Sequence, residues 1–174
     1  ILLIGCVSIF LGVIYTGGPL SLAYLGISDV FAFLFFGPVA VAGTYYLNTA
    51  QFHWDAVLLG VGPGLFSVAI LMVNNIRDYE TDRKANKKTV VVRFGKAFGI
   101  KSYQIIILIA FAMPVVFMLR DHAHYGLMGT SFLLFMIMPQ IQTLRTQSGA
   151  HLNKVLEKTA LVLPIYTLVH ILSW

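Results

Sequence analysis

The chain has 174 residues, of which 58% are hydrophobic and only 11% are charged. A soluble domain is about half apolar and about a quarter charged. The composition therefore excludes a disordered chain and almost any water-soluble enzyme. The single cysteine, Cys6, also excludes an internal disulfide. We expect an all-α, polytopic membrane protein.

Apolar stretches long enough to cross a membrane, which takes about 20 residues, occur five times. In chain order they are Asp29–Leu47, Ala56–Ile76, Ser102–Leu119, Tyr125–Thr143 and Val155–Trp174. Ile1–Tyr15 precedes them as a partial span. Because this stretch starts without Met and without the basic region of a signal peptide, we expect further residues upstream. The predicted fold is a single domain over residues 1–174, a transmembrane helix bundle of five full spans and one partial span.

Helix-breaking residues lie inside these stretches, as membrane helices tolerate. Gly60, Gly62 and Gly64 surround Pro63 within little more than one turn. Small residues at this spacing are typical of helices whose backbones approach closely, so we expect a packing contact there. His170, in the last span, is a candidate functional residue by its location, and a hydrogen bond near the helix end is an equally good explanation.

The formal net charge of +5 is confined to one segment. Between Arg77 and Lys101 lie eight of the 12 Lys and Arg residues and three of the seven acids, and the rest of the chain is neutral. Aromatic residues are sparse in this segment, and apolar stretches flank it, so no nucleic-acid partner is expected. Basic residues are concentrated in alternate loops, which predicts that the Arg77–Lys101 loop is cytosolic.

Candidate chemistry follows the second full span. On a helix at 100° per residue, Asn74, Asn75, Asp78 and Asp82 share one face. Two carboxylates four residues apart repel each other. A magnesium ion would offset this repulsion, since it takes one or two carboxylates and keeps phosphate and water as further ligands. Basic residues just downstream suit phosphate oxygens. From spacing alone, an ordinary mixed-charge loop remains an open alternative.

The stretch from Asn74 to Thr89, followed by Val92-Arg93-Phe94-Gly95, resembles the second aspartate-rich motif of the UbiA superfamily of intramembrane prenyltransferases. It is most similar to the branch that prenylates 1,4-dihydroxy-2-naphthoate in menaquinone synthesis. The segments Tyr15–Leu20 and Phe35–Pro38 resemble that branch as well. Position 86 is Asn where the branch usually has Gly.

The resemblance implies a nine-helix fold, of which this chain corresponds to the end of the fourth helix through the ninth. The first aspartate motif, which faces the second across a central cavity, is absent from these residues, so this fragment is expected to be inactive alone. The implied reaction is Mg²⁺-dependent transfer of a polyprenyl group from polyprenyl diphosphate to dihydroxynaphthoate with decarboxylation, giving demethylmenaquinone. The implied location is the bacterial inner membrane, with membrane lipid around the bundle.

Carried onto this sequence, the resemblance implies that Asp78 and Asp82 hold the Mg²⁺ ion and are the catalytic residues. The implied substrate contacts are Asn74, Arg77, Lys84, Lys87, Lys88 and Tyr15. Two alternatives stay open. One is a UbiA-type enzyme with another aromatic acceptor, such as a hydroxybenzoate or a chlorophyll-type precursor. The other is a membrane transporter or binding subunit, which would more naturally bury its acids at the membrane midplane. Isoprenoid chain length and oligomeric state stay open too.

Overall fold

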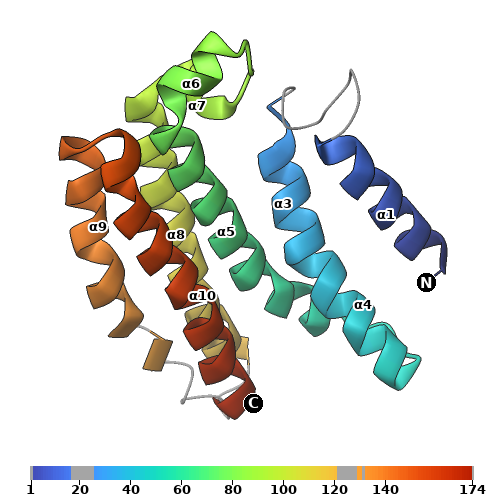
Figure 1. Cartoon of the computed structure of the whole chain (residues 1–174). Helices are drawn as coiled ribbons and strands as arrows, with labels where there is room; N and C mark the ends of the chain where they lie inside the picture. Colours follow the sequence, from blue (N-terminus) through green and yellow to red (C-terminus); the bar gives the residue numbers. More distant parts are fainter. Residues whose placement is uncertain (1, 17–25, 121–128, 131, 174) are drawn as a thin grey trace.

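A computed structural model describes residues 2–16, 26–120, 129, 130 and 132–173, and the regular elements among these are all helical (Figure 1). This confirms the all-α class. In chain order the elements are α1 (Leu2–Thr16), α3 (Ser28–Phe36), α4 (Pro38–Thr49), α5 (Trp54–Arg77), α6 (Tyr79–Lys84), α7 (Val90–Phe94), α8 (Lys96–Arg120), α9 (Leu134–Thr146), the short 3₁₀ helix η2 (Gly149–Leu152) and α10 (Asn153–Ser173).

Within the described residues, four helical stretches are long and apolar enough to cross a membrane. They are Ser28–Thr49, Trp54–Arg77, Lys96–Arg120 and Gly149–Ser173. These match four of the five predicted spans, and a shorter apolar helix, Gly5–Ile14, matches the partial span. The predicted span over 125–143 lies partly outside the described residues. Its later part forms α9, and its crossing of the membrane stays a prediction.

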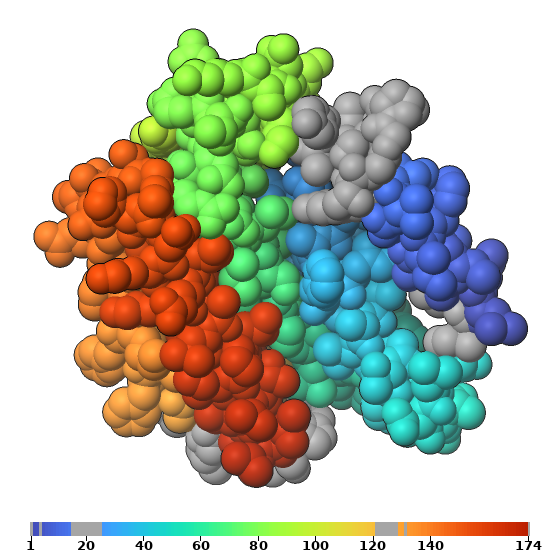
Figure 2. All heavy atoms as spheres, in the orientation of Figure 1, coloured from blue at the N-terminus to red at the C-terminus, as the bar shows by residue number. Residues whose placement is uncertain are grey.

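The long helices run alternately in opposite directions, so that the connections rich in Lys and Arg meet at one end (Figure 1). This end carries α6, α7 and η2, while the connection between α4 and α5 lies at the other. We call the first the charged end. Figure 2 shows α9 and α10 on one flank of the molecule and α1 on the opposite flank, with α3 and α5 between them. The predicted alternation of basic loops is therefore present in the fold.

Glycines bring the α3–α4 span against α5. The span is broken at Gly37, whose φ of −122° and ψ of −108° are not helical, and Pro38 begins α4. A Cβ atom added at Gly60 would lie 2.6 Å from the Cα of Pro38, and one added at Gly64 would lie 2.6 Å from the carbonyl oxygen of Phe33. Backbone touches backbone along this contact, which confirms the close packing that the glycines predict.

Aromatic rings join α5, α8 and α10 in the core. The ring of Phe66 in α5 lies 5.4 Å from that of Phe111 in α8 and 4.9 Å from that of Tyr166 in α10, measured between centroids. Phe66 is completely buried. Edge and tilted contacts of this kind add to the stability that burial alone provides. The three helices therefore form a rigid frame that extends to the charged end.

Four polar side chains in the core of α8 and α10 have hydrogen-bond partners. The hydroxyl groups of Tyr103 and Thr159 lie 2.9 Å apart, and the Tyr166 hydroxyl donates to the carbonyl oxygen of Ala110 at 3.1 Å. The Nδ1 atom of His170 lies 2.9 Å from the carbonyl oxygen of Tyr166, one turn earlier in α10. His170 is therefore satisfied by a hydrogen bond, which supports the structural explanation of this residue.

Candidate active site at the charged end

The motif lies where α5 ends and α6 begins. Asp78 forms the joint, with φ of −93° and ψ of 10°. Its N–H donates to the carbonyl oxygen of Asn74 at 2.9 Å, and the N–H of Asp82 donates to the carbonyl oxygen of Asp78 at 2.8 Å. The spacing of four residues between donor and acceptor therefore continues through the joint. The sequence predicted an uninterrupted helix here, and the structure has a single-residue turn at Asp78 instead.

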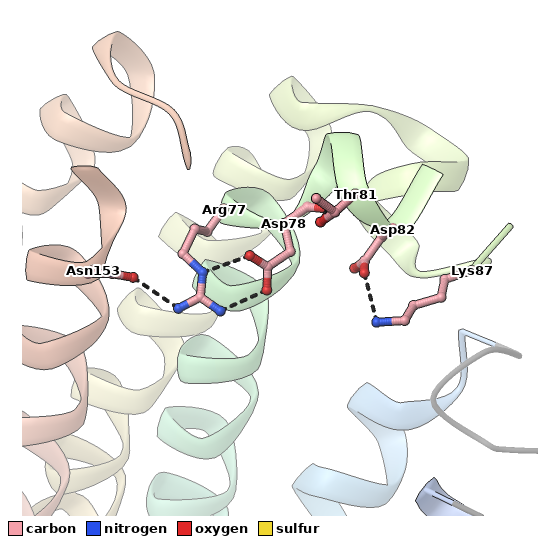
Figure 3. Close-up of polar contacts among 6 residues, drawn as sticks. All are labelled: Arg77, Asp78, Thr81, Asp82, Lys87 and Asn153. Atoms are coloured by element: carbon pink, nitrogen blue, oxygen red, sulfur yellow. Dashed lines mark hydrogen bonds and ion pairs between the residues drawn. The ribbon is translucent and has the colours of Figure 1, made fainter. Parts of the chain in front are cut away.

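Asp78 is held by its neighbour Arg77 (Figure 3). The Nε and Nη2 atoms of Arg77 donate to the two carboxylate oxygens of Asp78 at 2.8 and 2.7 Å, and its Nη1 donates to Oδ1 of Asn153 at 3.0 Å. Asn153 is the first residue of α10. The hydrogen bonds from Arg77 lower the pKa of Asp78 below its ordinary value. Asp78 is therefore ionised at neutral pH and tied to the start of α10.

Asp82 points to a different partner (Figure 3). It is 6% exposed, and its Oδ1 accepts a hydrogen bond from the Lys87 ammonium group at 2.8 Å. The N–H of Lys87 also donates to the carbonyl oxygen of Asp82 at 3.0 Å, so the chain after α6 folds back on the helix. Asn86 makes this turn with a φ of +55°. Glycine and asparagine adopt that conformation most readily, which explains why Asn can stand where the resembling branch usually has Gly.

The two acids and their two bases form one electrostatic cluster. Lys87 is close enough to Asp78 to contribute to the lowering of its pKa. The repulsion between Asp78 and Asp82 is thus already offset by Arg77 and Lys87, so this repulsion alone does not require a metal ion. Among the described residues, no three His, Cys, Asp or Glu side chains gather as metal ligands. The site offers two carboxylates.

Lys84 and Lys88, also predicted to bind substrate, are exposed. Within the described part of the chain neither forms an ion pair. Glu80 points to another partner, since its Oε1 accepts from Lys96 of α8 at 3.4 Å. Lys84 and Lys88 are therefore exposed and close to the acids in the sequence, while Arg77 and Lys87 are engaged with the acids.

The two adjacent asparagines differ in their surroundings. Asn74 is partly exposed, whereas Asn75 is 6% exposed, and its Nδ2 atom has no hydrogen-bond partner among the described residues. A buried donor without a partner costs free energy and marks a place where an acceptor fits. The helical spacing placed both asparagines on the face of the acids, and of the two, substrate contact was predicted for Asn74 alone. The doubled asparagine at the end of an apolar span is the signal that pointed here.

The start of α3 adjoins this site. Gly26, with a φ of +73°, packs directly against the carbonyl oxygen of Lys88, leaving no room for a Cβ atom. One turn further on, both carboxylate oxygens of Asp29 are buried, and no described residue forms a hydrogen bond with them. Asp29 was predicted only as the first residue of a membrane span. Tyr15 lies in the last turn of α1, and its side chain is outside the part of the structure that is described.

Together these features define a class of protein: a multi-pass membrane bundle with a buried and a half-buried carboxylate, flanked by bases, at one end. Residues 1–163 match the UbiA prenyltransferase family, and the chain belongs to that family. No solved structure matches the chain.

Three relatives illustrate the similarity. The protein from Mycobacterium leprae named 1,4-dihydroxy-2-naphthoate octaprenyltransferase is 31% identical over 97% of this chain and 56% of its own length. The protein of the same name from Mycobacterium tuberculosis is 37% identical over 67% of this chain and 40% of its own length. The 2-carboxy-1,4-naphthoquinone phytyltransferase of Synechocystis is 37% identical over 53% of this chain and 30% of its own length. The chain spans about half the length, or less, of these relatives.

Proposed function

We propose that the full-length protein transfers a polyprenyl group from polyprenyl diphosphate to 1,4-dihydroxy-2-naphthoate, and that residues 1–174 belong to one prenyltransferase domain. The observation that carries the proposal is the pair of carboxylates at the charged end of a membrane bundle, followed in the sequence by two exposed lysines that form no ion pair among the described residues. Family membership and the names of the relatives support it. Membership of a prenyltransferase family leaves the transporter alternative without support.

The donor chemistry at Asp78 and Asp82 fits a magnesium ion. Both side chains present carboxylate oxygens, the ligands that Mg²⁺ prefers. Asp78 has a lowered pKa, and Asp82 already holds a cation, the Lys87 ammonium group, at 2.8 Å. We therefore propose that these two residues hold Mg²⁺, which would stabilise negative charge on the leaving diphosphate as a Lewis acid.

The chain's own bases would bind the diphosphate. Lys84 and Lys88 are exposed, lie close to the acids in the sequence and can pair with phosphate oxygens. The Nδ2 atom of Asn75, which has no partner in the described part of the chain, supplies a further donor at the membrane end of the motif. Arg77 acts as a positioning residue, because it orients Asp78 through two hydrogen bonds. We propose that these groups hold the substrate while charge develops on the diphosphate.

The proposed reaction breaks one bond in the donor and one in the acceptor, and it forms one carbon–carbon bond. The bond between the first isoprenoid carbon and the diphosphate oxygen breaks, and the electron pair leaves with diphosphate. The ring carbon that bears the carboxylate forms the new carbon–carbon bond. Its carboxylate then leaves as CO₂, and the electron pair of that bond restores the aromatic ring. The product is the prenylated quinol, the reduced form of demethylmenaquinone.

The acceptor is better supported than the donor. The names of the relatives share a naphthalene-based acceptor, whereas the transferred group is octaprenyl in some and phytyl in another. A sibling enzyme with another aromatic acceptor is the second candidate. We also propose that the charged end faces the cytosol of a bacterium across its inner membrane, on the distribution of Lys and Arg among the loops.

Product analysis tests the proposal. Membranes that contain the full-length gene product are incubated with octaprenyl diphosphate, MgCl₂ and either dihydroxynaphthoate or 4-hydroxybenzoate, and products are identified by mass spectrometry. We expect a decarboxylated prenyl product with dihydroxynaphthoate as the acceptor and no product with 4-hydroxybenzoate. We also expect product formation to stop when EDTA removes Mg²⁺. Product from hydroxybenzoate alone would favour the sibling enzyme. No product from either acceptor by folded protein would contradict prenyl transfer to both.

A further inference from the structure

A cavity of about 500 Å³ opens between α8 and α9 near the charged end. Its polar lining consists of Lys101 and Gln104 from α8 and Arg145 from α9, and Ala97 and Ile100 complete it. None of these five residues is acidic. Within the described part of the chain, neither Lys101 nor Arg145 takes part in an ion pair. Two positive charges therefore face one cavity, and no acidic side chain among the described residues lines it or pairs with them.

An apolar surface continues from this cavity along α8. At 100° per residue, Lys101, Gln104, Ile105 and Leu108 lie on one face of the helix. Ile105 is 48% exposed and Leu108 is 66% exposed, although both lie within the membrane-spanning stretch. Leu108 is seven residues beyond Lys101, which places it about 10 Å deeper along the helix axis. This face is thus cationic at the membrane surface and apolar below it.

The facing surface of α9 has the same gradient. Met138 lies seven residues before Arg145 and within about 20° of it around the helix, and Met138 is 61% exposed. Because α9 runs toward the charged end, Met138 lies deeper than Arg145 (Figure 1). The two helices therefore present a pair of cations above apolar side chains. An anionic phospholipid has the matching arrangement, with a phosphate at the surface and acyl chains below it.

We propose that the cleft between α8 and α9 binds an anionic phospholipid. Lys101 and Arg145 contact the headgroup phosphate, Gln104 donates a hydrogen bond to it, and the acyl chains lie along Leu108 and Met138. A zwitterionic headgroup fits less well, because it brings a cation of its own toward two unneutralised charges. Inorganic phosphate lacks the chains that the apolar part would cover. The site is separate from the carboxylate cluster and does not depend on the proposed reaction.

This site is tested by titrating lipid into the full-length protein in detergent and detecting the bound lipid by native mass spectrometry. The probes are dioleoylphosphatidylglycerol, dioleoylphosphatidylcholine and inorganic phosphate. We expect phosphatidylglycerol to bind most tightly. The double variant Lys101→Gln/Arg145→Gln should weaken that binding about thirtyfold, since each basic residue near a membrane surface contributes about a fivefold factor. The matched control is Lys154→Gln/Lys158→Gln, which removes the same charge from α10 outside the cavity and should leave the affinity unchanged.

Four results would overturn the proposal: equal loss in both double variants, no loss in either, equal binding of phosphatidylcholine, or equal binding of inorganic phosphate. Charge-conserving variants guard against a folding defect. Lys101→Arg and Arg145→Lys should each retain phosphatidylglycerol binding within about threefold. If both of them lose it as fully as the double glutamine variant does, the residues act through packing, and the charge-based site is wrong.

Discussion

Replacing Gly64 with alanine should loosen the contact between α5 and the α3–α4 span. The added Cβ atom would lie 2.6 Å from the carbonyl oxygen of Phe33 and 3.2 Å from the Cα of Gly37. Ordinary van der Waals contact begins at 3.4 Å, so the backbones would have to separate by about 0.8 Å. Both neighbouring atoms belong to backbone and cannot rotate away. Overpacking of this kind costs about 1–3 kcal/mol, which lowers the Tm of a chain this size by about 2–12 °C.

The Tm is measured by thermal unfolding in detergent, with the loss of the helical circular dichroism signal as the readout. The matched control is Gly43→Ala in α4, where nothing lies within 4 Å of the added atom. Alanine favours a helix over glycine by about 1 kcal/mol, so the control should keep or raise the Tm. If Gly64→Ala unfolds at the same temperature as Gly43→Ala, the backbone contact described here does not exist in solution.

Three further predictions concern the charged end. Asn86→Val should destabilise the protein by about 1–2 kcal/mol, because a β-branched residue resists a positive φ, whereas Asn86→Gly should be neutral; equal Tm values for the two variants would refute this. Arg77 lowers the pKa of Asp78 in the folded protein. The contribution of this pair to the free energy of unfolding should therefore be fully present above about pH 4, the ordinary pKa of an aspartate, and should be lost as the pH falls through the lowered pKa. Chemical denaturation between pH 6 and 2 should show this decline in the wild type and a smaller one in Arg77→Met; identical declines would contradict it. Asp29→Asn should raise the Tm, because a buried carboxylate that has no partner among the described residues is costly; a lowered Tm would contradict this reasoning.

Hydropathy predicted the spans well because membrane-crossing length leaves little freedom. Asp29–Leu47 and Ala56–Ile76 agree with Ser28–Thr49 and Trp54–Arg77 to within a few residues. The break at Gly37 was harder to place, since Gly-Pro inside an apolar stretch is compatible with a kinked helix or with two helices. The close contact with α5 favours two helices. This contact is made by Gly60, which lies 23 residues after Gly37 in the sequence, so the local sequence around Gly37 does not reveal it.

The sequence predicted candidate site residues, whose role stays a prediction, and it did not predict the partners that the structure gives to the two acids. Helical spacing placed Asp78 and Asp82 on one face, which led to the expectation that they share a cation. In the structure each has its own base, because the turn after α6 carries Lys87 back to Asp82. Arg77 is also fixed by Asn153, 76 positions further along the chain. Periodicity describes one helix and contains no information on partners from elsewhere in the fold.

The central claim is that Asp78 and Asp82 support prenyl transfer as ligands of a metal ion. Initial rates of quinol formation by the full-length protein, measured over a range of Mg²⁺ concentrations, test it most directly. Asp78→Asn and Asp82→Asn should each lower the rate at least a hundredfold and shift the Mg²⁺ dependence to higher concentration. Glu80 is an exposed acid of α6 that pairs with Lys96. The control variant Glu80→Gln should therefore have the wild-type rate and the wild-type Mg²⁺ dependence. Full turnover in both asparagine variants at the wild-type Mg²⁺ requirement would contradict the claim.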